Sequence, residues 1–480
     1  MSALVVSLLV CLLVGVLIDR GVLGDPAFGW IERLGRGLML GLGSVGSLSL
    51  LVDGLGLGVS RATLGGAVGF LVLALVVPAW RVSPRFRLSE DEERKSLRSL
   101  SRNELLAHAA LLILACVGLA LAVRSGWLRP TFQFDAITRW MFKAKALAAD
   151  GTLFGVVSTD PYYSLTHQRY PPLVSHIANL PALVSGEFND RIASSIFPWF
   201  AVALVATAYG ALRRRSGALS GALAAAWIAN LPMLSFVLMP PPGAGAASAM
   251  ADIPLSLFLM GAVLALADGL QARRARGYVE AGLLLGFATL TKNEGLPLLV
   301  GVALAVLVSA PRSRWRCATG VAGLGLGLYL GLWGIAASGL PITDEHYLGR
   351  LHGDAFTAGL SRLGVIVSGL SEEVMNFRSW NLTWAVLTFL LMLGARRLGR
   401  PVPRMILVVL AVQCASYVVA YAVTSWSSPA AALIHPDGDP LPFLMKLTLG
   451  RLLMQVAPTA IVLGLIVSPL ASGGRPPRSC

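Results

Sequence analysis

The chain has 480 residues, of which 55% are hydrophobic and only 13% are charged, and its mean hydropathy is +0.71. Soluble domains carry about 25% charged residues, so this composition excludes a soluble enzyme. It also excludes disordered and coiled-coil proteins, which need polar sequences. The 51 glycines suit close packing of helices in lipid. The five cysteines lack CxxC spacing, which argues against a metal cage or a disulfide framework.

Eleven stretches have the length and apolar composition of membrane-spanning helices. They are 3–18, 37–58, 63–80, 105–123, 193–212, 218–238, 253–270, 317–339, 381–395, 403–424 and 452–471. A further stretch, 278–310, is interrupted by Thr291-Lys292-Asn293-Glu294-Gly295, which predicts two helices joined by a polar turn. The first apolar run lacks a basic start and is not expected to be a cleaved signal peptide. The sequence therefore predicts an all-α polytopic membrane protein with about 13 transmembrane helices.

The distribution of Lys and Arg gives the orientation of these helices. Of the 39 basic residues, 25 fall on one side, in loops 19–36, 81–104, 213–215, 271–277, 311–316 and 396–404 and in the tail after 471. The positive-inside rule makes this side cytoplasmic and places the N-terminus outside and the C-terminus inside. The net charge of +14 therefore indicates membrane orientation rather than nucleic-acid binding. The long loops 125–190, 341–378 and 425–450 are expected outside, and the chain contains no GxxxxGK[ST] phosphate loop.

The first long outer loop carries two groups of candidate site residues. Asp135, Arg139 and Lys143 have i, i+4, i+8 spacing and would share one face of a helix lying on the outer membrane surface. His167 and Tyr170, the latter followed by two prolines, suit a sugar or phosphate site. Surface ion pairs on an interfacial helix, and a loop packed on the membrane, are the alternative interpretations.

Later in the chain, Asp252 stands before Ile253-Pro254 and is expected to cap a helix at its outer end. Lys292 and Glu294 are costly in lipid and should face protein or water. Lys292 could pair with Glu294 alone, or it could bind a lipid phosphate. Arg451 is expected at the start of the last span, as a substrate contact or as a cation that extends to the interface.

The predicted outer loop around His346 and His352 contains residue types that can bind a metal ion. These residues lie near Asp344 and Asp354 but lack a recognised ligand spacing, so solvated loop residues are the preferred interpretation.

Four motifs in order resemble the membrane glycosyltransferases of the GT-C fold, in the bacterial branch near the aminoarabinose transferases and the protein O-mannosyltransferases. They are Phe-Asp135 with Trp140 and Lys143-Ala-Lys145, then Tyr170-Pro171-Pro172, then Ala-Asp252-Ile-Pro254, and then Leu-Thr-Lys292-Asn-Glu294-Gly295. The resemblance covers roughly 105–471. Residues 1–104 are expected to form accessory helices and a cytoplasmic connector, 105–471 a GT-C-like catalytic domain, and 472–480 a short basic tail.

The resemblance implies transfer of a hexosyl or pentosyl group, with inversion, from a polyprenyl-phosphate donor to an envelope glycan, lipid or protein acceptor. Transfer would occur on the outer face of a bacterial plasma membrane. Asp135 and Asp252 would be the catalytic carboxylates, and Asp135 would orient or deprotonate the acceptor. Lys292, with Arg451, would hold the leaving phosphate, while His167 and Tyr170 would border the sugar. Glu294, Arg139 and Lys143 complete the expected substrate-binding set.

Many relatives carry adjacent acidic residues at the first motif, whereas this chain has Asp135-Ala136. A single hard oxygen ligand there weakens the case for a divalent cation, which is left as the weakly supported alternative to a site without a cofactor.

A transporter or flippase is the main rival class, because broken helices and buried charges are also transporter features. The cytoplasmic halves of the predicted spans are almost free of polar residues, with Asp268 and Glu280 near loop ends, which disfavours a transporter. A non-catalytic scaffold of an envelope complex is the third possibility. The membrane lipids themselves are the remaining expected partner, and no nucleic acid is expected.

Overall fold

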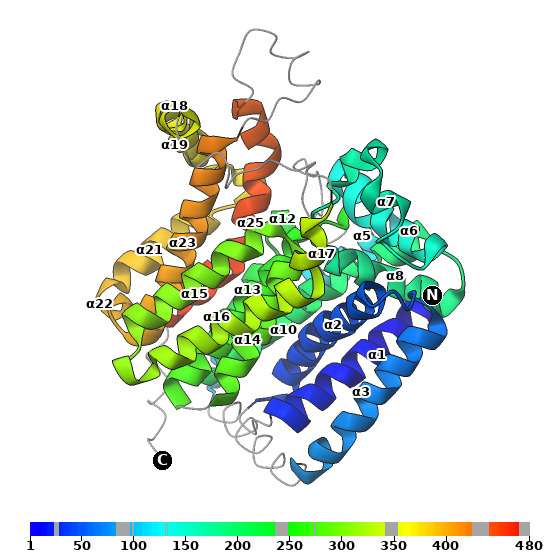
Figure 1. Cartoon of the computed structure of the whole chain (residues 1–480). Coiled ribbons are helices and arrows are strands. Elements are labelled where there is room, and N and C mark those ends of the chain that lie inside the picture. The colour runs from blue at the N-terminus through cyan, green and yellow to red at the C-terminus, as the bar shows by residue number, and fades with distance from the viewer. Residues whose placement is uncertain are drawn as a thin grey trace.

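The computed structural model of the chain is a bundle of long helices with shorter helices gathered at one end (Figure 1). It describes residues 1–23, 28–82, 97, 100–129, 131, 133–235, 248–272, 275–340, 354–424 and 441–469. Within these residues the secondary structure is helical and contains no strand. The predicted fold class, an all-α polytopic membrane protein, is confirmed.

The helices of the bundle vary widely in length. The longer helices are α1 (Ser2–Ile18), α2 (Trp30–Gly54), α3 (Arg61–Val82), α5 (Arg102–Leu128), α8 (Leu173–Ser185), α10 (Phe197–Ser216), α11 (Ala218–Ala229), α13 (Asp252–Ala272), α14 (Ala275–Thr291), α15 (Leu296–Ser309), α16 (Trp315–Tyr329), α19 (Leu363–Val374), α21 (Thr383–Leu393), α23 (Pro401–Val423) and α25 (Leu441–Val467). Shorter helices are α6 (Phe142–Asp150), α7 (Val156–Thr159), α9 (Asp190–Ser194), α12 (Pro232–Ser235), α17 (Ile335–Ser338), α18 (Asp354–Ser361), α20 (Phe377–Trp380) and α22 (Ala395–Leu398).

Among the described residues, nine helices are long and apolar enough to cross a membrane. Their ranges are Ser2–Leu23, Trp30–Gly54, Arg61–Trp80, Arg102–Leu128, Asp190–Ser216, Asp252–Gln271, Arg312–Ser338, Pro401–Val423 and Leu441–Val467. Each of the 13 predicted spans coincides with at least one helix, although several of these helices are shorter than a full crossing. The helical positions were therefore predictable, whereas the number 13 stays a prediction.

The interrupted stretch forms two helices, as predicted. Helix α14 ends at Thr291, Lys292 is extended (φ −160°, ψ 149°), and a single 3₁₀ turn, η6 (Asn293–Gly295), leads into α15. Gly295 packs directly against the end of α14, and a Cβ at this position would lie 2.3 Å from the carbonyl oxygen of Ala288. The glycine therefore lets the polar turn close tightly onto the preceding helix.

The last helix differs from the prediction. The expected span 452–471 starts just after Arg451, but α25 begins at Leu441 and extends to Val467. Lys446 and Arg451 divide an otherwise apolar sequence, which shifted the predicted start. As a result Arg451 lies well inside a helix rather than at its end.

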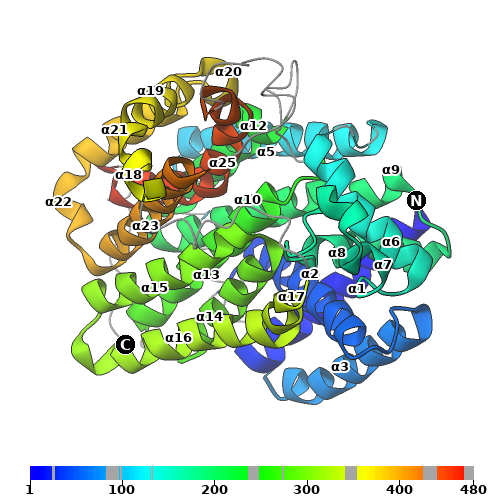
Figure 2. The same ribbon diagram turned by 45° about the horizontal axis from the view of Figure 1, so that its top comes forward.

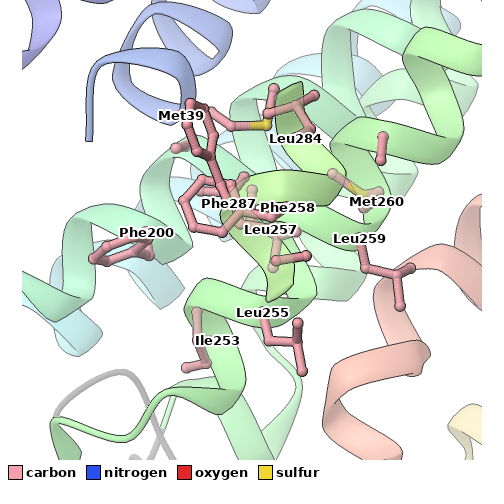
Figure 3. Close-up of a cluster of buried hydrophobic side chains, with 14 of the residues drawn as sticks. Met39, Phe200, Ile253, Leu255, Leu257, Phe258, Leu259, Met260, Leu284 and Phe287 are labelled. Carbon is pink, nitrogen blue, oxygen red and sulfur yellow. The ribbon is translucent and has the colours of Figure 1, made fainter. Parts of the chain in front are cut away.

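Helix α13 lies at the centre of the bundle, where it packs against α14, α25 and α10. Figure 3 shows its side chains meeting those of neighbouring helices, including Phe258 beside Phe200 and Phe287. Met39 of α2 approaches so closely that a Cβ at Gly261 would lie 2.4 Å from its sulfur. This apolar packing fixes the first turn of α13, which carries Asp252.

The other end of α13, away from Asp252, holds a buried cluster of ion pairs. Its ion pairs are Arg36–Asp19 (3.3 Å), Arg36–Glu280 (2.5 Å), Arg214–Glu32 (2.7 Å), Arg214–Asp268 (3.1 Å) and Arg215–Asp268 (2.5 Å). Asp252 and Asp268 are separated by about 24 Å along the helix at 1.5 Å per residue. The expectation that the predicted cytoplasmic halves are almost free of polar residues is wrong, because loop-end residues of five segments converge inside the bundle.

Helix α2 is part of this interior. It packs against α1, α10 and α8, whereas α3 lies at the edge of the bundle (Figure 2). Other expectations concern residues outside the described ranges: His346 and His352 with Asp344, and the tail 472–480.

Candidate active site

One continuous chain of ion pairs joins motifs that are distant in the sequence. Arg451 donates from Nη1 to Asp135 Oδ2 at 2.6 Å and from Nε to Asp252 Oδ2 at 3.0 Å. On its other side, Asp135 lies 3.5 Å from Arg139, measured from Oδ1 to Nη2. The Arg451 guanidinium on α25 therefore bridges the segment that precedes α6 and the start of α13.

The network of ion pairs continues from Asp252 to the polar turn between α14 and α15. Lys292 Nζ lies 2.9 Å from Asp252 Oδ1 and 2.8 Å from Glu294 Oε1. Glu294 Oε2 in turn accepts a hydrogen bond of 2.8 Å from the hydroxyl of Tyr170. All four motifs thus meet at one place. Lys292 has two acidic partners rather than Glu294 alone, so the simple internal pair considered from the sequence is wrong.

The local backbone at the first motif explains the positions of its three charged residues. Asp135 precedes a π-helical turn, η3 (Ala136–Met141), which continues directly into α6. A π turn inserts an extra residue per turn and rotates the following side chains relative to an α-helix. Arg139 pairs with Asp135 at the predicted i, i+4 spacing. The prediction that Lys143 lies on the same helix face is wrong, because its amine contacts the turn at 167–170.

Lys143 is buried and holds the backbone of the second motif. Its amine donates to the carbonyl oxygens of His167 (3.0 Å), Gln168 (3.5 Å) and Tyr170 (3.0 Å). His167 has a positive φ of 50° and its ring lies 6.1 Å from that of Tyr170. Lys143 thus shapes the turn that presents Tyr170, rather than pointing a free cation toward a ligand.

Asp252 does not act as the predicted helix cap. Among the described residues, its carboxylate accepts hydrogen bonds from the side chains of Lys292, Arg451 and Gln455, the last at 2.7 Å, and from no backbone N–H. Arg451 is likewise not an interfacial cation, because its side chain is only 11% exposed and is paired with two carboxylates. Side-chain pairing across the bundle outweighed both local expectations.

Three neutral residues of the site were missed from the sequence. Gln455 receives a 2.7 Å hydrogen bond from Tyr417, and Gln413 donates to Tyr417 (3.0 Å) and to the carbonyl of Glu294 (2.9 Å). Gln455 follows Arg451 by four residues and shares its helix face, which is the one signal that could have indicated it. Gln413 and Tyr417 have the same spacing on α23.

The charges within this ion-pair network balance, because three carboxylates face three cations. Exposure is uneven: the side chains of Glu294, Arg139 and Asp135 are 23%, 19% and 15% exposed, whereas Lys292 is 4% exposed. Within the part of the chain that the structure describes, the buried Nε of Arg139 has no hydrogen-bond partner, and its guanidinium lies 5.7 Å from the ring centroid of Tyr170. The accessible side of the site is therefore bordered by Arg139, Tyr170 and Glu294.

The electrostatic environment keeps Asp135 ionised. Burial alone would raise the pKa of its carboxyl, but the charges of Arg451, Arg139 and Lys292 hold this pKa below its usual range. An ionised carboxylate that is already paired accepts hydrogen bonds well but is a weak proton acceptor. Among the described residues, no group of three or more His, Cys, Asp or Glu side chains is placed to hold a metal ion.

Comparison with protein families gives a match to part of the chain. Residues 169–334 match the family model described as dolichyl-phosphate-mannose-protein mannosyltransferase. This region contains Tyr170, Asp252, Lys292 and Glu294, and it excludes Asp135 and Arg451. A comparison with curated proteins finds no match to the chain.

Together with the apolar helices, this match supports a multi-pass membrane protein of the glycosyltransferase class. The predicted resemblance to the GT-C membrane glycosyltransferases is confirmed by it.

Proposed function

We propose that the protein transfers a sugar from a polyprenyl-phosphate donor to an acceptor on the extracytoplasmic face of a bacterial plasma membrane. The acceptor would be an envelope glycan, a lipid or a protein, and the sugar a hexose or pentose. The name of the matched family supports a lipid-phosphate donor. The observation that carries the proposal is the ion-pair chain Arg139–Asp135–Arg451–Asp252–Lys292–Glu294, which gathers all four motifs at one site.

The proposed reaction is a single displacement with inversion at the anomeric carbon. A bond forms between an acceptor oxygen or nitrogen and the anomeric carbon, while the bond from that carbon to the phosphate oxygen breaks. Asp135 accepts a hydrogen bond from the nucleophile, orients it, and takes its proton as the new bond completes. Because the cations beside it lower its basicity, proton transfer should occur late, when the nucleophile has become acidic.

The leaving phosphate requires cations that can turn toward it. Arg139 has spare donor capacity and a relatively exposed side chain, and Lys292 is the next cation around Tyr170 and Glu294. Glu294 is the most exposed of the three carboxylates in this ion-pair network, so it is the group that a phosphate would displace from Lys292. Arg451 then keeps both Asp135 and Asp252 in place and adds positive charge beside the breaking bond.

The outer location rests on the distribution of basic residues and on the separation of the two ionic clusters. The site lies at one end of α13 and the Arg36–Arg214 cluster at the other. The basic residues Arg214, Arg215 and Arg276 lie at the second end. By the positive-inside rule the site then faces outward, where nucleotide sugars are absent and a lipid-linked donor is required.

The test of this proposal is a donor comparison with purified protein in nanodiscs. We expect turnover of at least one polyprenyl-phosphate monosaccharide from a panel of hexoses and pentoses, measured as release of polyprenyl phosphate in the presence of envelope extract. The matching nucleotide sugars should not be consumed. Consumption of a nucleotide sugar without turnover of any lipid-linked sugar would contradict the proposed donor class.

A further inference from the structure

Asp53, near the end of α2, makes a set of contacts that the reaction itself does not use. Its carboxylate accepts a hydrogen bond of 2.5 Å from the hydroxyl of Thr152 and one of 3.0 Å from the backbone N–H of Leu153. His176 Nε2 lies 3.6 Å from the same carboxylate, and its other ring nitrogen is 2.9 Å from the hydroxyl of Ser49. Asp53 is 1% exposed, so this is a built interior contact rather than a surface pair.

These contacts hold the segment that directly follows α6. Helix α6 ends at Asp150, and Gly151 adopts the left-handed conformation that terminates it. The carbonyl of Gly151 accepts a 2.6 Å hydrogen bond from the backbone of Val59, in the connection between α2 and α3. The N-terminal helices thus fix the C-terminal end of the helical segment that carries Arg139 and Lys143.

The segment held by Asp53 also supports the turn at 167–170. The ring of Phe154 packs against Trp333 at 5.7 Å, and the indole of Trp333 donates to the carbonyl of Arg169 at 3.1 Å. Gln168 reaches back from the turn and donates to the carbonyls of Val157 (3.1 Å) and of residue 160 (2.7 Å). Two routes therefore connect the segment after α6 with the turn.

A third route runs through Lys143, whose amine bonds three carbonyls of that turn. Tyr170 ends the turn and donates to Glu294, the partner of Lys292. The position of the Tyr170 hydroxyl therefore depends on the segment that Asp53 holds.

We propose that Asp53 is a positioning residue for the transfer reaction: by holding Thr152 and Leu153 it fixes the turn that places Tyr170 against Glu294. This role rests on the proposed function and assigns a task to the N-terminal helices. Asp53 itself touches neither substrate nor a reacting atom.

The test compares Asp53→Asn with Thr152→Val, which removes one donor, and with a matched control. Asp19→Asn is the control, because it changes a buried carboxylate of the same N-terminal helices near the opposite end of the bundle, 3.3 Å from Arg36. We expect Asp53→Asn to lower kcat at least tenfold and Thr152→Val to lower it less. Asp19→Asn should lower the melting temperature about as much as Asp53→Asn does, but it should leave kcat within twofold of the wild-type value.

Tyr170→Phe separates positioning from general destabilisation. If Asp53 acts through Tyr170, the variant that combines Asp53→Asn with Tyr170→Phe should lose little more activity than the more impaired of the two single variants. If the fold-losses in kcat of Asp53→Asn and Tyr170→Phe multiply in the double variant, the inference is overturned. Equal kcat values in Asp53→Asn and Asp19→Asn would overturn it as well.

A second measurement does not depend on the reaction. Acylation of the Lys143 amine, followed by mass spectrometry, should increase in Asp53→Asn but not in Asp19→Asn. Unchanged protection of Lys143 in Asp53→Asn would overturn the proposed route even if no substrate were identified. Failure of the proposed function would appear differently, as normal turnover in Asp135→Asn or no turnover of any lipid-linked donor by wild type.

Discussion

Replacing Asp135 with asparagine should lower turnover by about 10²–10⁴-fold while leaving the protein folded. The amide keeps the shape of the side chain but lacks the charge that orients the nucleophile and accepts its proton, and a positioned base contributes about this factor. Folding should persist because Arg451 keeps its 3.0 Å pair with Asp252. The measurement is kcat with a lipid-linked donor, together with the melting temperature of the purified variant.

Asp150→Asn is the matched control, since Asp150 is an exposed carboxylate at the end of the same helical segment. It should retain wild-type turnover. Near-normal turnover of Asp135→Asn would remove Asp135 from the reaction, and Asp252→Asn would then show whether the second carboxylate dominates.

The pH dependence follows from the same ion pairs. Because the pKa of Asp135 is held below its usual range in the folded protein, its contribution to stability is present above the unfolded pKa, about 3.9, and is lost as the pH falls toward the folded value. Asp135 should therefore cause no loss of turnover between about pH 5 and 8. An acidic limb in that range has to come from another group.

Lys292 should give the second large effect. The single substitution Lys292→Met leaves Asp252 and Glu294 without their shared cation, and breaking a buried pair of this kind costs about 3–5 kcal/mol of unfolding free energy. The double variant Lys292→Met with Glu294→Gln removes one charge of each sign. Asp252 still has Arg451 and Gln455, so stability should largely return.

Turnover separates the two roles of Lys292. If the lysine also binds the donor phosphate, the stable double variant should bind polyprenyl phosphate poorly and turn over slowly. Lys145→Met, which removes an exposed cation from α6, should change neither property. Normal affinity and turnover in the double variant would reduce the Thr-Lys-Asn-Glu-Gly turn to a structural ion pair.

Much of the fold was predictable because lipid imposes strong constraints on sequence. Apolar runs located the helices, and the polar interruption at 291–295 correctly predicted two helices with a turn between them. The start of α25 was missed because hydropathy treats Arg451 as a boundary. Inside the bundle, two carboxylates neutralise this arginine, so the helix continues through it.

The site was predictable as a set of residues but not as a set of contacts. Four sequence motifs contain Asp135, Asp252, Lys292 and Glu294, and the structure brings these four residues together. Which cation meets which carboxylate depends on helix packing far apart in sequence. Local spacing also misplaced Lys143, because the π turn before α6 has no signature in hydropathy or charge.

The same limit applies to the second ionic cluster. Glu32, Arg36, Arg214, Asp268 and Glu280 each look like ordinary loop-end charges in the sequence. Only the packing of α2 against α10 and α14 shows that they are neutralised within the protein. The cluster removes one sequence argument against a transporter, so the choice between the two classes now rests on the composition of the site and on the matched family.

The most direct measurement is a structure of the protein in nanodiscs with a bound polyprenyl-phosphate monosaccharide. The account predicts that the phosphate lies within hydrogen-bond distance of Arg139 and Lys292, that Glu294 has moved away from Lys292, and that Asp135 faces the anomeric carbon from the side opposite the phosphate. A donor phosphate bound at the Arg36–Arg214 cluster, or anywhere out of reach of both Arg139 and Lys292, would contradict it.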